Sequence, residues 1–463
     1  MNDELEIKND ELMELIKLKE LVTYRKQFIE IREDKKYKRC RVQLHRRGVK
    51  LRDEVFGHQI KTKKQRLCKA DDFIVAEMDA KFGGYGMIPD YLEDAIVSSH
   101  YYLYELKKDR LLPMFLDVII DSGVFQEQIK AVGSTNYSRV SAKEVLEYEV
   151  TCPSLQKQQE IVDHYFQCKR NATELKTELT HQQTLLKKLR QQILQEAIEG
   201  KLTADWRKQN PDVEPASELL KRIQAEKAQL IKDKKIKKQK PLPLICEDEK
   251  LFDLPDGWVW CRLGDLSKQY VDCPHDTPKY QGKGFLCLRA PDITENGLLI
   301  KTIRRVSKEE YDKRIRRLKP VRNDLVYIRE GGRLGIAGLI DTDEPVCLGQ
   351  RVMMLRFLNE VTAKYSLRFL NAPDTYNDIV GKTIGSASPH VNVRDIIAHV
   401  VPVPPLPEQK AIVTKVEKLL ALCDQLESQI TRNQRHAEQL MQAVLREAFS
   451  QPSEQAEKEA SCV

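Results

Sequence analysis

The chain has 463 residues, with 77 Lys and Arg against 70 Asp and Glu, which gives a formal net charge of +7. Its 41% hydrophobic and 32% charged residues exclude a disordered polar chain, and this charge balance predicts separate basic and acidic patches. No apolar run predicts a membrane span, Met1–Glu4 lacks the features of a secretory signal, and the 11 cysteines are scattered as reduced thiols usually are. We therefore expect a soluble, cytoplasmic protein with several domains.

The first globular part is predicted to cover residues 1–153 and to mix strands with helices. It opens with an acidic stretch, Asp10–Val22, that has the composition of a helix. Tyr37–Leu44 then alternates polar and apolar residues with the period of two that a half-buried strand shows. Basic residues cluster on the loops that follow, and we expect them to form a positively charged surface. The candidates there are Arg46, Arg47 and Lys81.

Residues 154–204 are predicted to form one long helix, because Pro153 fits only the first turn of a helix or the residues before it. Apolar residues recur at intervals of three and four along this segment, which is the 3.5-residue period of a coiled coil. About 40 residues at 1.5 Å per residue give a helix of about 60 Å. The predicted seam consists of Leu175, Leu179, Gln182, Leu186, Leu189 and Ile193.

A linker over residues 205–252 separates this helix from a second globular part at 253–404. It contains a predicted short helix, Glu218–Ile231, and a lysine run that fits a solvated surface better than a phosphate site. In the second part, 284–288 and 324–328 have strand patterns bounded by turns. The candidate surface cations of this part are Arg289, Arg329, Arg333 and His390.

A second long helix is predicted at 405–450, after a proline-rich stretch, and the polar residues 451–463 are expected to be disordered. This helix shows the same alternation of three and four as the first. Its predicted seam consists of Leu426, Ile430, Asn433, Ala437, Leu440 and Val444.

The two halves of the chain repeat one another. Val140 and Val391 begin matching stretches 251 residues apart, and this offset holds without a gap through both long helices. Two matched seams favour pairing of the helices with each other, while packing of each helix on its own domain stays the alternative. We therefore predict an α+β fold, in which two mixed α/β domains are joined by two long coiled-coil helices with an internal pseudo-two-fold repeat.

The motifs that would indicate catalysis are missing from the sequence. Gly381-Lys382-Thr383 lacks the glycine that a P-loop needs five residues earlier, where Tyr376 stands. Cys273 and His275 have no second ligand pair at zinc-site spacing. We predict no catalytic residue, metal or cofactor in this chain. The basic loops favour DNA binding instead, because Lys and Arg offset phosphate charge and Arg can bind guanine edges.

Several stretches resemble the specificity subunits of type I restriction–modification enzymes. Glu199–Arg207 closes the first long helix in the way that family does, and Pro405–Val413 opens the second. Leu254–Leu266 and Gly385–Asn392 are similar to the same family. The resemblance covers almost the whole chain, although Pro153–Gln158 lacks the Pro-Glu-Gln of the second helix and Asp10–Val22 replaces a counterpart to Asp256-Gly257-Trp258.

The resemblance implies that each globular part is a target-recognition domain for one half of a split, asymmetric site in double-stranded DNA. The two helices would pair antiparallel as a spacer and would dock two methyltransferase subunits, and through them the ATP-dependent restriction subunits. S-adenosylmethionine, ATP and magnesium would belong to those partners. No base-contacting residue transfers by motif, so the seven candidate DNA-binding residues rest on charge and loop position alone.

Two alternative functions stay open at this point. The chain could be the specificity component of a methylation-only or fused-type restriction system, which has the same DNA recognition with different partners. It could also be a cytosolic coiled-coil scaffold whose basic loops only keep it soluble. Sequence-selective and salt-sensitive DNA binding separates the scaffold from the other functions.

Overall fold

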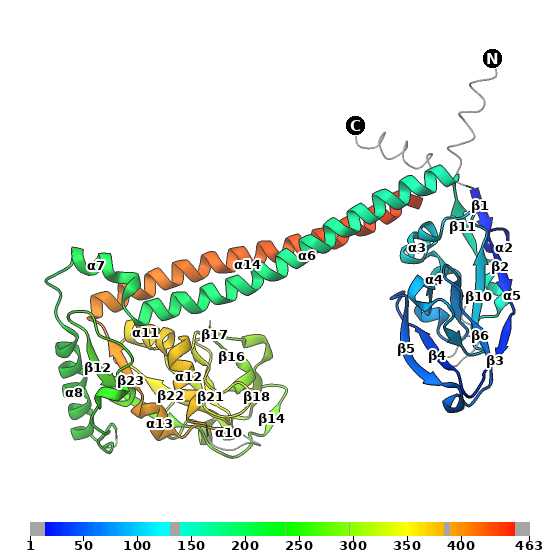
Figure 1. The fold of residues 1–463 in the computed structure, drawn as a ribbon. Helices are drawn as coiled ribbons and strands as arrows, with labels where there is room; N and C mark the ends of the chain where they lie inside the picture. Colours follow the sequence, from blue (N-terminus) through cyan, green and yellow to red (C-terminus); the bar gives the residue numbers. More distant parts are fainter. Residues whose placement is uncertain (1–13, 130–138, 237, 296, 384–388, 450–463) are drawn as a thin grey trace. The chain divides into compact units, whose positions relative to one another are not determined.

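The computed structural model describes residues 14–129, 139–236, 238–295, 297–383 and 389–449 (Figure 1). The predicted tail after 450, the stretch 385–388 and the first residues of Asp10–Val22 lie outside these ranges. The chain divides into two compact units, residues 1–180 with 431–463 and residues 181–430. Each unit therefore contains one globular domain and a part of each long helix.

The first domain contains two sheets. Its described strands are β1 (Glu14–Lys17), β2 (Val22–Arg25), β3 (Phe28–Glu30), β4 (Lys36–Val42), β5 (Val49–Phe56), β6 (Lys64–Leu67), β7 (Phe73–Ala76), β8 (Tyr85–Met87), β9 (Ile96–Val97), β10 (Tyr101–Leu106) and β11 (Glu149–Cys152). Its short helices are α2 (Leu18–Leu21), α3 (Pro113–Ser122), α4 (Val124–Gln128) and α5 (Ala142–Val145). One sheet has the order β2-β10-β7-β8, the other has the order β3-β6-β9-β4-β5, and β1 pairs with β11.

The second domain repeats one of these sheets and changes the other. Its described strands are β12 (Val259–Arg262), β13 (Gln269–Asp272), β14 (Tyr280–Gln281), β15 (Phe285–Leu288), β16 (Ile293–Thr294), β17 (Gly297–Leu298), β18 (Arg304–Val306), β19 (Leu325–Ile328), β20 (Ala337–Leu339), β21 (Val346–Leu348), β22 (Val352–Arg356) and β23 (Val400–Val403). The order β13-β22-β19-β20 matches β2-β10-β7-β8, and the pair β12·β23 matches β1·β11. The order β14-β18-β15-β21 differs from the second sheet of the first domain.

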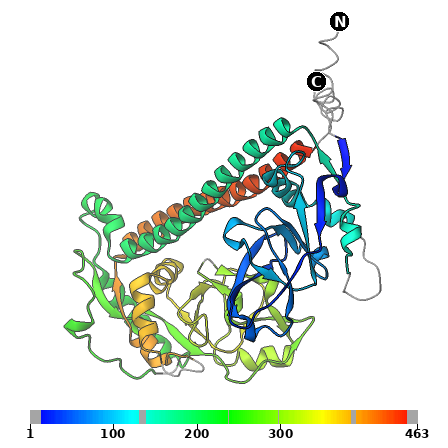
Figure 2. The same cartoon turned by 45° about the vertical axis from the view of Figure 1, so that its right-hand side comes forward.

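The helices of the second half complete the repeat. They are α9 (Leu263–Leu266), α10 (Lys308–Arg314), α11 (Glu360–Leu370), α12 (Pro373–Gly381), α13 (Val393–Ala398) and the long α14 (Leu406–Phe449). The long helix of the first half is α6 (Leu155–Ile198), and the linker carries α7 (Ala204–Gln209) and α8 (Ala216–Lys232). The predicted fold class is therefore confirmed, with two mixed α/β domains and two long helices that lie side by side (Figure 1, Figure 2).

The helix expected at Asp10–Val22 is wrong for the described part of that stretch. Residues 14–17 form β1, only Leu18–Leu21 is helical, and β2 begins at Val22. The cause is non-local, because β1 pairs with β11 more than 130 residues later and Leu18 and Leu21 are fully buried. This strand, short helix and strand match β12, α9 and β13. The place that corresponds to Asp256-Gly257-Trp258 precedes β1 and lies outside the described residues.

Both long helices begin with a buried glutamine that forms similar hydrogen bonds. Gln158 in α6 and Gln409 in α14 are fully buried, and the Nε2 of each donates to a proline carbonyl five residues earlier, at 2.9 Å. The Oε1 of Gln158 accepts from the Leu112 amide, and the Oε1 of Gln409 accepts from the Thr362 hydroxyl. Each glutamine therefore fastens the start of its helix to its own domain, and a buried amide with all these partners costs little desolvation.

The two helices pack on each other along one line of residues seven apart. Leu179, Leu186 and Ile193 of α6 and Ile430 and Val444 of α14 are 2–7% exposed. In the first unit the early part of α6 faces the late part of α14, and in the second unit Arg190 pairs with Asp424 and Glu427 of the early part of α14. The helices therefore run antiparallel in each unit.

The other half of the predicted seam faces away from the helix–helix contact. Gln182 and Asn433 are exposed, and Leu175, Leu189, Leu426 and Leu440 are 43–59% exposed. Residues one position further along each helix lie nearer the partner helix: Lys176, Gln434 and Met441 line the groove between the helices in the first unit, and Arg190 pairs with Asp424 in the second. The exposed leucines fit the alternation of three and four as well as their neighbours one residue further along do. The sequence pattern therefore does not distinguish the exposed leucines from the residues nearer the partner helix.

The buried Ile193 and the exposed Leu189, both on α6, give a matched test of stability in the second unit. We expect Ile193→Ala to cost about 2–4 kcal/mol, because Ile193 is 6% exposed, and Leu189→Ala to cost less than about 0.5 kcal/mol, because Leu189 is 47% exposed. Tryptophan fluorescence during urea unfolding measures both, since Trp206, Trp258 and Trp260 all lie in this unit. Equal costs would place Leu189 inside the helix pair.

Each domain core is closed by the helix that starts on the other domain. In the first unit, Val444 of α14 belongs to the buried cluster that contains Val162 and Tyr165, and Leu445 packs against it. In the second unit, Ala197 and Ile198 of α6 are fully buried. Gln195 of α6 donates to Asp374 of α12 at 2.8 Å. Both domains therefore depend on residues from both halves of the sequence.

Candidate nucleic-acid interface

In each domain, two loops meet at one end of the repeated sheet. In the first domain, loop 43–48 after β4 docks on loop 77–84 after β7, where the Arg46 amide donates to the Gly83 carbonyl at 3.0 Å. In the second domain, the described part of segment 289–303 after β15, which includes the short strands β16 and β17, docks on loop 329–336 after β19. There the Arg333 Nη2 donates to the Ile293 carbonyl at 2.9 Å. We call these the first loop pair and the second loop pair. They follow strands in equivalent places, because β4 and β15 each lie parallel to a neighbour, β9 or β21.

The seven candidate DNA-binding residues fall in these two places. Arg46, Arg47 and Lys81 lie in the first loop pair, and Arg289, Arg329 and Arg333 lie in the second. His390 joins the second pair through a β-bridge to Glu330. A matching contact in the first domain runs from the Val140 amide to the Glu77 carbonyl. Charge and loop position alone thus selected residues that the fold brings together within each domain.

Most of these guanidinium groups are held by the protein itself. Arg329 is 7% exposed and forms two hydrogen bonds with Asp272, at 2.8 and 3.2 Å. Arg289 binds Asp292, which is fully buried, and these hydrogen bonds raise the pKa of Arg289. Arg333 donates to backbone carbonyls. Truncating Arg289 or Arg329 would leave a carboxylate without its main partner, so these two residues stabilise the loops that carry them.

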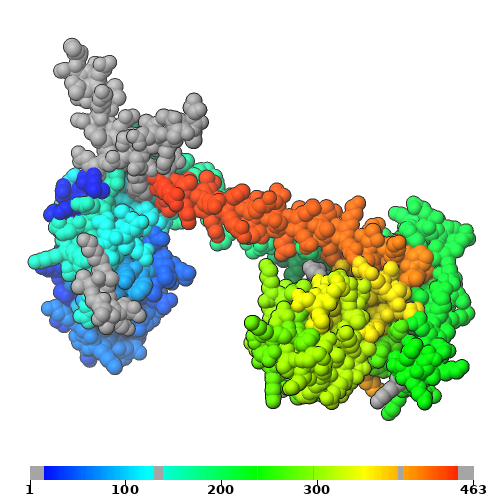
Figure 3. Space-filling view, turned by 180° about the vertical axis from the view of Figure 1, so that it is seen from behind, coloured from blue at the N-terminus to red at the C-terminus, as the bar shows by residue number. Residues whose placement is uncertain are grey.

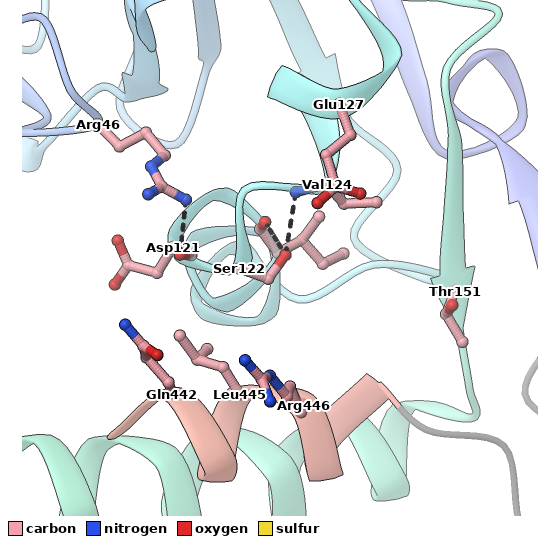
Figure 4. A pocket seen from close by; sticks show the side chains of 10 residues that line it. Arg46, Asp121, Ser122, Val124, Glu127, Thr151, Gln442, Leu445 and Arg446 are labelled. Atoms are coloured by element: carbon pink, nitrogen blue, oxygen red, sulfur yellow. Dashed lines mark hydrogen bonds between the residues drawn. The ribbon is translucent and has the colours of Figure 1, made fainter. Parts of the chain in front are cut away.

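The Arg46 guanidinium also forms a hydrogen bond within the first domain, whereas Arg47 forms none with a described residue. The Nη1 of Arg46 donates to the Asp121 carbonyl at 2.9 Å, beside a cavity of about 440 Å³ between α3, α4 and the end of α14 (Figure 4). Arg47 is exposed and forms no hydrogen bond or ion pair with any described residue. The Lys81 side chain is half-buried, and its carbonyl accepts from Gln126.

The sequence did not indicate Arg351, which the structure adds to the second loop pair. Arg351 is exposed and has a φ of +68°, a left-handed conformation that is rare for side-chain-bearing residues and often marks functional sites. Its guanidinium passes Gly331, where an added Cβ would lie 3.4 Å from the Arg351 Nη1. Its carbonyl accepts from the Arg329 amide. The only local signal was Gly349, two residues earlier, which is too common a turn residue to single it out.

The long helices carry a second exposed surface. Leucines of 43–59% exposure lie beside the helix–helix contact on both helices, and Figure 3 shows α14, orange to red, uncovered along much of its length. We call this surface the leucine stripe. It consists of Leu175, Leu185 and Leu189 of α6 and Leu422, Leu426 and Leu440 of α14. Within the second unit, Leu185 and Leu189 lie one turn apart on α6, and Leu422 and Leu426 lie one turn apart on α14. Neighbouring exposed leucines of this kind often mark a protein–protein contact.

The described residues contain neither a metal-binding cluster nor a membrane-spanning helix. Within the described ranges, no three or more His, Cys, Asp or Glu side chains are grouped so that they could hold a metal ion. Among the described helices, none is long and apolar enough to cross a membrane.

A family model for the type I restriction modification DNA specificity domain matches residues 6–183 and again residues 255–433. The chain belongs to this family, and the two matches coincide with the two halves of the repeat. The specificity subunits of the Escherichia coli type I restriction enzymes EcoEI and EcoAI are 31% and 34% identical to it over 52% and 51% of the chain. The matched stretch covers 41% and 40% of their lengths, which is less than half of these curated relatives.

Solved structures agree on the fold. The crystal structure of the HsdS subunit from Thermoanaerobacter tengcongensis has a TM-score of 0.59 at 17% identity, over 94% of this chain and 96% of that one. A chain from a study of complex assembly and conformational transition of the type I R-M system has a TM-score of 0.64 at 16% identity, over 94% and 97% of the two chains. At this identity the likeness concerns the fold alone.

Proposed function

We propose that this chain is the non-catalytic DNA-specificity subunit of a type I restriction–modification complex and acts in the cytoplasm. Each domain recognises one half of a bipartite, asymmetric site in double-stranded DNA. The observation that carries this proposal is the repeated sheet together with the loop pair at its end in each domain, because the two loop pairs differ in sequence and lie at equivalent positions. A rigid scaffold with exchangeable basic loops suits readout of base edges in the major groove. Because the second sheets of the two domains also differ, the two half-sites differ.

The partners in this proposal are methyltransferase subunits bound along the paired helices, with restriction subunits held through them. The leucine stripe supports two equivalent docking places, because Leu175 and Leu189 of α6 correspond to Leu426 and Leu440 of α14 at the repeat distance. Two copies of one partner would then bind related surfaces. S-adenosylmethionine, ATP and magnesium would be bound by those partners.

We expect Leu189→Glu with Leu440→Glu to abolish co-purification of the methyltransferase subunits while the unfolding midpoint stays unchanged. Both side chains are about half exposed, so the charges remain solvated in the free chain but would be buried in the complex. Affinity chromatography of the tagged chain from its host measures this, and Arg432→Glu, an exposed position on α14, serves as the control. Retention of the partners by the double variant would exclude the leucine stripe as the docking surface.

Mapping modified bases in the host genome, with and without this gene, tests the proposed function. We expect one bipartite motif to lose its modification when the gene is deleted and to regain it on complementation. A purified complex should bind that motif with an affinity that falls as salt increases. A genome whose modified motifs do not depend on the gene would support the scaffold alternative, and modification without cleavage of unmodified DNA would support the methylation-only system.

A further inference from the structure

Loop 43–48 of the first loop pair has a strained backbone that hydrogen bonds to loop 77–84 hold in place. His45 and Arg46 have φ values of +58° and +59°, so two successive residues with side chains adopt the left-handed conformation. The His45 amide donates to the Phe82 carbonyl at 2.7 Å, and the Arg46 amide donates to the Gly83 carbonyl at 3.0 Å. The strain therefore persists because loop 77–84 fixes the turn from outside.

The Arg46 side chain fastens the same loop to the helical layer. Its Nη1 donates to the Asp121 carbonyl at the end of α3 (Figure 4). The Asp121 Oδ2 accepts from the Tyr165 hydroxyl at 2.7 Å and from the Lys169 Nζ at 2.6 Å, and both of these residues lie on α6. A continuous set of contacts therefore runs from the long helix through α3 to the tip of the hairpin β4–β5.

Two glycines make room for this arrangement. A Cβ added at Gly83 would lie 2.9 Å from the Arg46 amide nitrogen, and one added at Gly123 would lie 2.5 Å from the Arg46 Nη1. Both glycines also have positive φ values, +74° and +88°. The space that they leave is therefore filled by the backbone and the guanidinium of Arg46.

The next residue, Arg47, is exposed and has no charged partner among the described residues, and His45 and Lys50 nearby in the sequence are also exposed. A two-stranded ribbon fits the major groove of B-DNA, and an arginine there can bind a guanine through two hydrogen bonds. A side chain with no partner of its own on a doubly anchored loop is pre-organised for such a contact.

Resting on the proposed function, we infer that Arg47 contacts a base in the half-site of the first domain and that Arg46 is the positioning residue that aims it. Arg46 is thereby removed from the set of DNA contacts that charge alone suggested. The two adjacent arginines have different roles because the Arg46 guanidinium is bound to the Asp121 carbonyl, whereas the Arg47 guanidinium has no partner among the described residues.

The test is modified-base mapping in cells that carry the complete system with single variants of this chain. We expect R47A to reduce the preference for at least one base of one half-site about tenfold, and to leave the other half-site unchanged. R46A should reduce the preference at the same half-site, although Arg47 is still present. R46K, which keeps one donor for the Asp121 carbonyl, should restore most of that preference.

The controls separate this inference from its premise. K143A removes an exposed charge of the same domain outside the loop pairs and should leave the motif unchanged. Thermal unfolding of the purified chain should be unchanged for R47A and K143A and lowered for R46A. The inference is overturned if R47A leaves both half-sites unchanged, or if R46A unfolds early yet keeps the wild-type base preference. A wild-type chain on which no modified motif depends would instead overturn the proposed function.

Discussion

Replacing Glu408 with alanine is expected to destabilise the second unit by about 3–5 kcal/mol, the cost of removing the buried partner of an ion pair whose other member, Arg207, is 22% exposed. Glu408 lies in the first turn of α14, is 1% exposed and accepts three hydrogen bonds. The donors are the Thr203 hydroxyl at 2.7 Å, the Arg207 Nη1 at 2.5 Å and the Trp258 indole at 2.8 Å. This carboxylate therefore joins the end of α6, the start of α14 and the entry to the second domain.

Tryptophan fluorescence in urea measures the loss directly, since Trp258 is itself one of the donors. The matched control is Glu417→Ala on the same helix, where an exposed carboxylate lies 3.8 Å from Lys364, and this change should cost less than about 0.5 kcal/mol. If both variants unfold at the same urea concentration, the junction does not hold the unit together. The first copy has Lys157 at the corresponding position, so no equivalent effect is expected there.

Deleting seven residues from each long helix, 173–179 and 434–440, is expected to shorten the unspecified gap of the DNA target by about three base pairs. The segments face each other in the first unit, where the groove between the helices is lined by both. Seven residues shorten a helix by about 10.5 Å, and B-DNA rises about 3.4 Å per base pair. One heptad also keeps the contact line in phase. The bases of both half-sites should stay the same, as modified-base mapping would show.

Deleting only one of the two segments is the control, because it puts the paired helices out of register and should abolish modification. A double deletion that keeps the original gap, or that changes the bases of a half-site, would contradict a spacer role for the helices. The prediction depends on the proposed function and on the 44-residue length of each helix, about 66 Å at 1.5 Å per residue.

The parts of the fold that the sequence predicted are those whose signals are local or repeated. The 251-residue repeat predicted two domains with two helices, and the strands at Tyr37–Leu44, 284–288 and 324–328 are present in the structure with small changes of boundary. The segment before Val22 was mistaken for a helix because its partner strand is distant in sequence. This error comes from a contact that a local pattern does not contain.

The seven candidate residues lie in or beside the two loop pairs, and their role in DNA binding stays a prediction. Charge alone does not say which of these arginine side chains faces solvent. Arg329 is paired with Asp272, 57 residues away, and Arg46 is bound to a carbonyl 75 residues away. Only the folded chain shows that the guanidinium groups of Arg329 and Arg46 are bound within the protein. Arg47 and Arg351 are exposed.

The closure of the first domain by α14 has a consequence for synthesis. The cluster that holds Val162 and Tyr165 is completed by Val444, so the domain that leaves the ribosome first is completed last. At about 5–20 residues per second, the interval between Tyr165 and Val444 takes roughly 15–55 s. During that time the apolar face of the nascent domain that α14 will cover is open to solvent and to chaperones. The core of the first domain is therefore complete only when almost the whole chain has been synthesised.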